Sequence, residues 1–166
     1  MANNAETKPL SLYDKFIMEE GLQVHNKAQM LFPDGVLITG DYLTAFNKTK
    51  QLLNDPAVST LFEGTFIIHK GITKADILLK KPSGWHLMEI KSGFDPKDEY
   101  LDDLAYTTMV CLQAGLSLTT CSETTKVVNG TPGQGSRVVV RKILVGKKDG
   151  KHSHQVHLHP QIPAYW

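Results

Sequence analysis

The spacing of apolar residues predicts two helices in the first third of the chain. Apolar side chains recur at mainly helical spacing from Ser11, a residue suited to cap a helix, to Phe32, where the turn Pro33-Asp34-Gly35 ends the pattern. A second helical run begins at Asp41, another capping residue, and ends at Leu53.

Three segments rich in Ile, Leu, Phe and Thr come after the second helix and are joined by short turns. They are predicted as the strands of an antiparallel meander: Leu61–His69, Thr73–Lys80 and Trp85–Lys91. A shorter strand, Val36–Ile38, is predicted between the two helices.

The second half of the chain starts with a helix and ends in extended segments. A third helical pattern begins near Pro96, which the first turn of a helix tolerates, and it ends before Gly115. Leu116–Thr120 is predicted as the last strand of the core. The composition then changes to a Gly-rich loop and a predicted hairpin formed by Arg137–Val145 and Gln155–His159.

Length and composition indicate one soluble globular domain. The chain has 166 residues, of which 41% are hydrophobic and 21% charged, enough for a single core. We expect a disordered N-terminus at 1–9, a core at 10–121 and a basic C-terminal extension at 122–166. No apolar run reaches the roughly 20 residues of a membrane span, and the start lacks a signal-peptide stretch, so a cytoplasmic location without membrane contact is expected.

The net charge of +1 conceals an asymmetry along the chain. Residues 1–118 hold 11 basic and 15 acidic side chains, whereas residues 119–166 hold 7 and 2. A basic segment on an acidic body suits a polyanionic partner, although such segments are often only solvated. The candidates for phosphate contacts are Arg141, Lys142, Lys147, Lys148 and Lys151.

Candidate chemistry gathers on the predicted meander. Side chains alternate along a strand, so Glu89 and Lys91 share one face, and Asp76 on the partner strand can approach Glu89. Two carboxylates with an ammonium beside them suit a hard divalent cation such as Mg²⁺ or Mn²⁺. The alternative is an amphipathic hairpin in which Glu89 and Lys91 form a weak pair on a solvated face.

The order of these residues resembles a known nuclease signature. Asp76, then Glu89-Ile90-Lys91 at the end of a hairpin, then a helix, is similar to the PD-(D/E)XK nuclease superfamily. Its RecB-like branch carries a G-x-x-x-H element on the first helix, and Gly21-Leu22-Gln23-Val24-His25 matches it. The resemblance covers roughly Phe16 to Leu118 and extends to uncharacterised bacterial proteins with a RecB-like nuclease domain.

The resemblance implies an α/β fold with a restriction-endonuclease-like αβββαβ core, a mixed central sheet flanked by helices, to which the C-terminal hairpin is added. It implies that Asp76, Glu89, His25 and the Ile90 carbonyl bind the metal and that Lys91 is the catalytic lysine. His25 has the alternative of a partly exposed helix histidine. Glu63 is a candidate for an outer-shell or direct carboxylate, against the alternative of a solvated strand residue.

The chain also departs from that branch. The helix after the signature usually carries a glutamine that positions DNA, and here Thr107 stands at that place. Some relatives hold a four-cysteine iron–sulfur cluster, whereas this chain has only Cys111 and Cys121, which are expected to be reduced. The segment after Thr120 does not resemble the segments found C-terminal to the core in such relatives.

The sequence thus predicts a Mg²⁺- or Mn²⁺-dependent deoxyribonuclease, acting as an exonuclease or an endonuclease, with DNA as its partner and contacts from Thr107 and the basic extension. One alternative is a weakly active or inactive nucleic-acid-binding module with the same fold. Another is a structural or interaction domain whose hairpin charges are surface decoration. A serine-nucleophile elbow and a Walker phosphate loop are both missing from the sequence.

Overall fold

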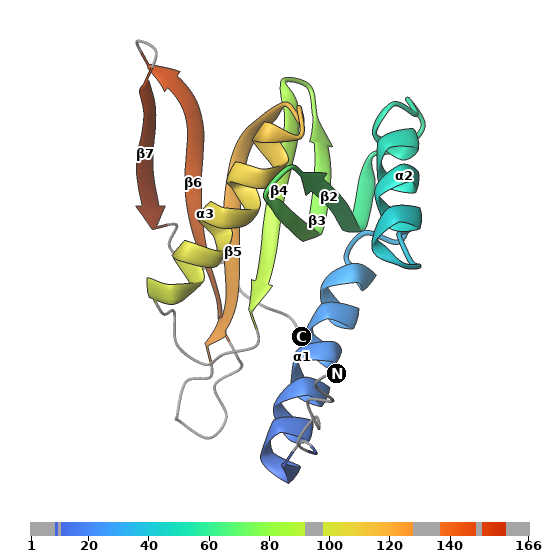
Figure 1. Ribbon diagram of the computed structural model, residues 1–166. Coiled ribbons are helices and arrows are strands. Elements are labelled where there is room, and N and C mark those ends of the chain that lie inside the picture. Colours follow the sequence, from blue (N-terminus) through green and yellow to red (C-terminus); the bar gives the residue numbers. More distant parts are fainter. Residues whose placement is uncertain (1–8, 10, 92–97, 128–136, 149–150, 159–166) are drawn as a thin grey trace, which may run out of the picture.

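The computed structural model describes residues 9, 11–91, 98–127, 137–148 and 151–158, with most side chains up to Thr124 (Figure 1). In this part of the chain the helices are α1 (Leu12–Met30), α2 (Tyr42–Leu53) and α3 (Asp98–Gln113). The strands are β1 (Val36–Leu37), β2 (Thr60–Ile68), β3 (Gly71–Lys81), β4 (Gly84–Lys91), β5 (Leu118–Val127), β6 (Arg137–Lys148) and β7 (Lys151–Leu158).

The strands lie in one sheet in the order of the chain. β1 pairs with β2 in parallel, β2 to β4 form an antiparallel meander, and β4 pairs with β5 in parallel. These five strands form a mixed sheet flanked by helices, and β6 and β7 continue it by antiparallel pairing. A parallel pair needs a crossover connection, and α3 is the helix of the crossover between β4 and β5.

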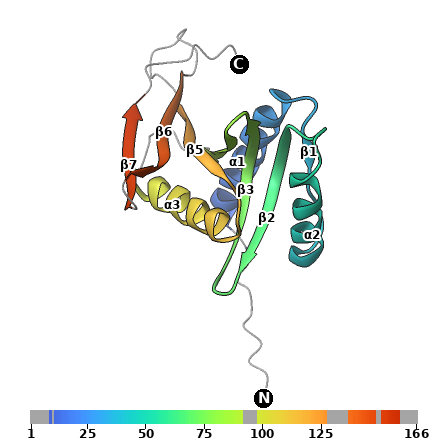
Figure 2. The same cartoon turned by 90° about the horizontal axis from the view of Figure 1, so that it is seen from above.

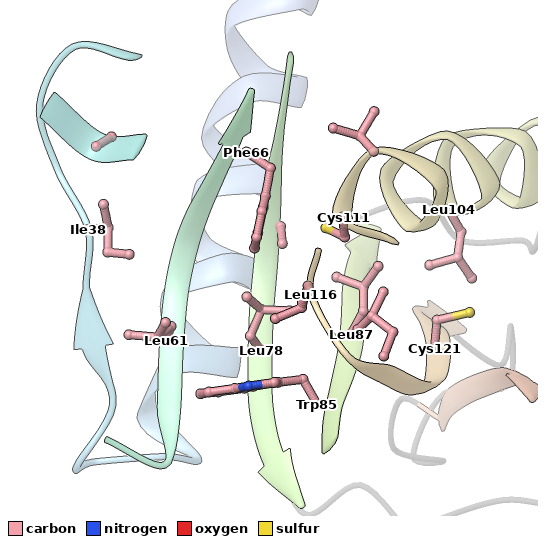
Figure 3. Packing of buried hydrophobic residues seen from close by; sticks show 14 of the residues in the cluster. Ile38, Leu61, Phe66, Leu78, Trp85, Leu87, Leu104, Cys111, Leu116 and Cys121 are labelled. Atoms are coloured by element: carbon pink, nitrogen blue, oxygen red, sulfur yellow. The ribbon is translucent and has the colours of Figure 1, made fainter. Parts of the chain in front are cut away.

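Two apolar clusters hold helices against the two faces of the sheet (Figure 2). The larger cluster joins α2 and α3 to the sheet, and Figure 3 shows Leu104 and Cys111 of α3 near Leu87 and Cys121. In the smaller cluster, Ala28 of α1 packs with buried residues of β2, β3 and β4. Because a fully buried leucine contributes roughly 2 kcal/mol, these contacts fix the helices on the sheet.

Only the C-terminal half of α1 is packed. The helix begins with a capping box, in which Ser11 and Asp14 bond each other's backbone N–H groups. Leu12 and Phe16 then remain 86% and 57% exposed, although they belong to the predicted apolar pattern. The N-terminal half extends past the ends of the strands (Figure 1), so its apolar side chains do not reach the core.

The predicted helices and the meander are confirmed, each with boundaries shifted by a few residues. The last strand of the core is longer than predicted, because β5 pairs with β4 from Leu118 to Thr125, with one register shift between Trp85 and His86, and so continues beyond Cys121. None of the helices in the described part of the chain has the length and hydropathy of a membrane span.

Candidate metal centre

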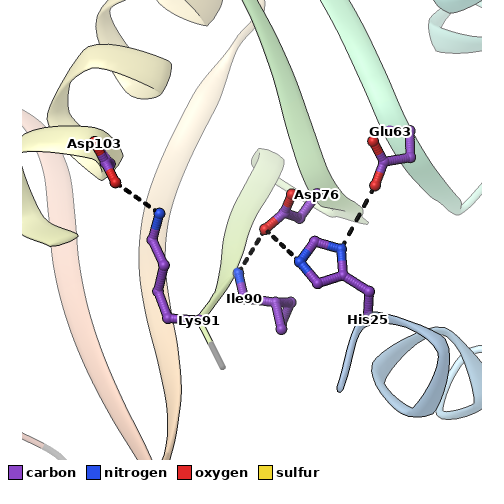
Figure 4. A network of polar contacts seen from close by, with 6 residues as sticks. All are labelled: His25, Glu63, Asp76, Ile90, Lys91 and Asp103. Atoms are coloured by element: carbon purple, nitrogen blue, oxygen red, sulfur yellow. Dashed lines mark hydrogen bonds and ion pairs between the residues drawn. The ribbon is translucent and has the colours of Figure 1, made fainter. Parts of the chain in front are cut away.

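Side chains from three elements converge on the α1 side of the sheet (Figure 4). His25 lies on α1, Glu63 on β2 and Asp76 on β3, and each offers a ligand atom within 4.8 Å of the other two. His25 Nδ1 is 3.7 Å from Glu63 Oε1, and His25 Nε2 is 3.8 Å from Asp76 Oδ2. One imidazole and two carboxylates therefore surround a common point.

A break in the alternation of β2 turns Glu63 toward α1. Leu61 and Phe66 pack in the same cluster, the one under α2 and α3, although residues five apart in a regular strand face opposite ways. Phe62 packs in the other cluster. Glu63 has a φ of 59°, which lies in the left-handed region and shifts the alternation by one residue.

The alternation of side chains between the two faces of the sheet is also interrupted in the partner strand β3, opposite Glu63. Ala75 and Leu78 share the cluster under α2 and α3, although residues three apart in a regular strand face opposite ways. The β2–β3 register is the same on both sides of the break, but Glu63 and Asp76 do not form a ladder pair. Because both strands break together, both carboxylates reach His25 without a slip in register.

Asp76 also closes the end of the β3–β4 ladder. The paired residues stop at Ile77 and Met88, and the Ile90 N–H then donates to Asp76 Oδ2 at 2.7 Å. The backbone of Ile90 also contacts His25 and helps to raise the pKa of the imidazole. An acceptor has this effect, and the backbone acceptor of Ile90 is its carbonyl, the group that the resemblance implies as a ligand.

Glu89 lies beside this group, where its side chain shares hydrogen bonds with Asp76 and with Thr107 of α3. Its side chain is only 6% exposed, and its Oε1 has no hydrogen-bond partner. Burial raises the pKa of Glu89 to about 9, and the charge of Asp76 acts in the same direction. Glu89 is thus close to Asp76 electrostatically, although it is not part of the group formed by His25, Glu63 and Asp76.

Lys91 shares the face of Glu89 but forms its ion pair with α3. Its Nζ donates to Asp103 Oδ2 at 2.8 Å and lies 5.5 Å from the centre of the Tyr100 ring. Burial lowers the pKa of Lys91, but the contact with Asp103 and the nearby carboxylates of Glu89 and Asp76 more than offset it, so the pKa is raised. The ammonium therefore remains charged.

The group on the α1 side holds protons that a cation would replace. The contact with Glu63 raises the pKa of His25, and the charge of Asp76 adds to this against the effect of burial. Burial raises the pKa of Asp76, although the nearby His25 opposes the shift. A divalent cation supplies the positive charge that such a half-buried cluster of acids lacks.

The other residues singled out from the sequence are Thr107, the two cysteines and the basic residues of the C-terminal extension. Thr107 is buried, and its Oγ1 lies 3.1 Å from Thr73 Oγ1 and beside Glu89, so it lines the interior of the site and not the surface. Cys111 and Cys121 are buried, and no disulfide joins them. The predicted phosphate contacts, Arg141, Lys142, Lys147, Lys148 and Lys151, lie outside the residues whose side chains are described.

Sequence reasoning missed two acidic residues of this region. Asp103 carries no pattern of its own, because an acid on an exposed helix face is ordinary. Glu123 on β5 is fully buried and in register with Glu89, a placement that arises from the parallel β4–β5 pairing. Glu123 stands in a Thr- and Ser-rich segment with no apolar alternation to mark its face, and the predicted strand ended at Thr120.

Comparisons with family models, with curated proteins and with solved structures found no match for this chain.

Proposed function

We propose that this protein is a metal-dependent deoxyribonuclease built on a restriction-endonuclease-like αβββαβ core. The observation that carries the proposal is the convergence of His25, Glu63 and Asp76 within 4.8 Å, next to a buried Glu89 and a charged Lys91. These residues come from four elements that are far apart in the sequence. Acidic side chains are rarely buried without a functional or structural reason, and Asp76 and Glu89 are both largely buried here.

The donor set fits a divalent cation that accepts both oxygen and nitrogen ligands. Carboxylates suit Mg²⁺ and Mn²⁺, whereas an imidazole favours Mn²⁺ or a later transition metal over Mg²⁺. The unpartnered Oε1 of Glu89 and the Ile90 carbonyl are further oxygen donors at the same end of the sheet. A bound cation would polarise a phosphodiester and lower the pKa of a bound water molecule.

Asp76, Lys91 and Glu89 have different roles in the proposed reaction. Asp76 is fixed by the Ile90 N–H, so it can orient a ligand oxygen without rotating. Lys91 is the charged group next to these carboxylates, suited to orient the attacking water or to stabilise negative charge on the phosphate. Glu89 adds a carboxyl group beside Asp76 and Lys91, and this group keeps its proton near neutral pH when no cation is bound.

A second candidate function is nucleic-acid binding without rapid turnover. The observation that favours it is the contact of Lys91 with Asp103, because in this arrangement the ammonium is already neutralised by a carboxylate. Metal-dependent cleavage of DNA would distinguish the nuclease from a protein that only binds nucleic acid.

The test is a cleavage assay on the purified protein. Labelled single-stranded, linear double-stranded and circular DNA are incubated with Mg²⁺, Mn²⁺ or EDTA. We expect cleavage that requires the metal, is faster with Mn²⁺, and falls by about 100-fold or more in Lys91→Ala, the usual order of effect for a group acting in the transition state. Consumption of circular DNA would identify an endonuclease.

Lys81→Ala is the matched control, because Lys81 is an exposed lysine on β3. It should cleave at the wild-type rate. DNA binding without cleavage in any metal would support the binding module, and neither binding nor cleavage would contradict both candidate functions.

A further inference from the structure

The contact between Lys91 and Asp103 joins the candidate site to α3. Lys91 is two residues after Glu89, so both side chains leave β4 on the face that α3 covers. A lysine stem is long enough to fold back to a carboxylate two positions away on the same face. The ammonium is found instead at 2.8 Å from Asp103 Oδ2, on the helix.

The consequence is visible at Glu89. Its Oε1 is buried and has no hydrogen-bond partner, although a charged ammonium stands on the same face of the strand. A buried carboxyl oxygen without a partner costs free energy, and a hydrogen bond from the Lys91 ammonium would remove that cost. Asp103 therefore competes with Glu89 for the ammonium, and in this structure Asp103 binds it.

Stability alone does not account for Asp103. Its side chain is 62% exposed, and ion pairs with so exposed a partner contribute little to folding. Tyr100, one turn earlier on α3, places its ring 5.5 Å from the same ammonium. Two side chains of α3 thus hold Lys91 on the helix side of the site.

We propose that Asp103 is a positioning residue, which holds the Lys91 ammonium on α3 and thereby keeps its positive charge away from Asp76, a ligand of the candidate metal centre. The inference rests on the proposed function, because it gives Asp103 a role at the same metal centre. Without Asp103, the ammonium moves to Glu89 and Asp76 and competes with the cation there.

The test is the affinity of the metal-free protein for Mn²⁺, measured by calorimetric titration at low salt. Asp103→Asn should weaken Mn²⁺ binding by about five-fold or more, because a positive charge moves several ångströms toward the cation. Asp103→Glu should restore it. Asp102→Asn removes the same charge from the neighbouring exposed position of α3 and should bind Mn²⁺ within two-fold of wild type.

A double-mutant cycle separates positioning from a direct effect of the lost charge. In a Lys91→Met background, Asp103→Asn should change Mn²⁺ affinity by less than two-fold, because no ammonium is left to move. An equal loss in both backgrounds would overturn the proposal. Thermal unfolding of each variant verifies that it is folded.

The outcomes distinguish this inference from the proposed function. If wild type binds Mn²⁺ and Asp103→Asn binds it equally well, the positioning role is wrong and the metal centre stands. If wild type binds no Mn²⁺, the metal centre is wrong and the inference fails with it.

Discussion

Glu63 has the backbone conformation that departs most from its surroundings. A φ of 59° is costly for a residue with a side chain, typically 1–3 kcal/mol, and it occurs within β2 where the chain turns a carboxylate toward His25. Asn adopts this conformation more readily than Glu. In the metal-free protein, Glu63→Asn should therefore be more stable than Glu63→Gln by about 0.5–1 kcal/mol.

Chemical denaturation in EDTA measures this difference, and a Mn²⁺ titration completes the comparison. Both variants lose the carboxylate and should bind Mn²⁺ about 10-fold or more weakly than wild type. Equal stability of the two variants would show that the backbone at Glu63 stores no strain.

Glu89 makes stability fall as the pH rises. Its pKa is raised from 4.5 to about 9, so the folded protein keeps a proton that the unfolded chain releases. The resulting stabilisation is complete below pH 4.5 and is lost as the pH rises toward 9. Between pH 5 and pH 8 in EDTA, the free energy of unfolding should fall by an amount on the order of 4 kcal/mol.

Glu89→Gln is the variant that tests this assignment. Its amide resembles the protonated acid and does not titrate, so its unfolding free energy should depend less on pH than that of wild type. Denaturant titrations at several pH values provide the measurement. Parallel pH profiles for the two proteins would contradict a buried, protonated Glu89.

If the proposed metal centre is correct, His25 should control the pH dependence of cation binding. Its pKa is raised above 6.5, mainly by Glu63, and a metal binds only the neutral imidazole. Mn²⁺ affinity should therefore increase with pH through and above 6.5, until the imidazole is neutral. Titrations from pH 5.5 to 8.5 measure this dependence. His25→Asn should lose affinity at high pH and show a flatter profile, and an unchanged profile would exclude His25 as a ligand.

At the scale of elements, α1 is the part of the site that is held most weakly. Only its C-terminal half packs on the sheet, while Leu12 and Phe16 stay exposed. A cation bound between His25, Glu63 and Asp76 would connect α1 to β2 and β3.

Amide hydrogen exchange in α1 should therefore slow when Mn²⁺ is added, most clearly near His25. The effect should vanish in His25→Ala. It should persist in Asn26→Ala, which changes the next, exposed residue of the same helix. Exchange that is unaffected by Mn²⁺ in wild type would show that α1 contributes no ligand.

Elements were predictable from sequence where local signals exist. Ser11 and Asp41 cap their helices as expected, and short turns define the meander. The left-handed position in β2 was not predictable, because Glu63 is not a residue type that signals such a conformation. That conformation turns Glu63 from a possible outer-shell residue into a member of the His25 group.

At the scale of the whole molecule, the site depends on strand order and on helix packing. Asp76 and Glu89 were expected to lie together from one hairpin, and the β3–β4 register does place them at the same level. That Asp76 also contacts His25 of α1, while Glu89 also contacts Thr107 of α3, is determined only by the packing of both helices. The contact of Lys91 with Asp103 has the same origin, since it crosses from β4 to a helix.

The central claim is that His25, Glu63 and Asp76 bind one divalent cation. The most direct measurement is a crystal structure of the protein with Mn²⁺, using the anomalous signal of the metal. We expect a single strong peak within about 2.3 Å of a ligand atom from each of the three residues, as for oxygen and nitrogen ligands of such ions. Absence of a peak there at millimolar Mn²⁺, with the three side chains in place, would contradict the account.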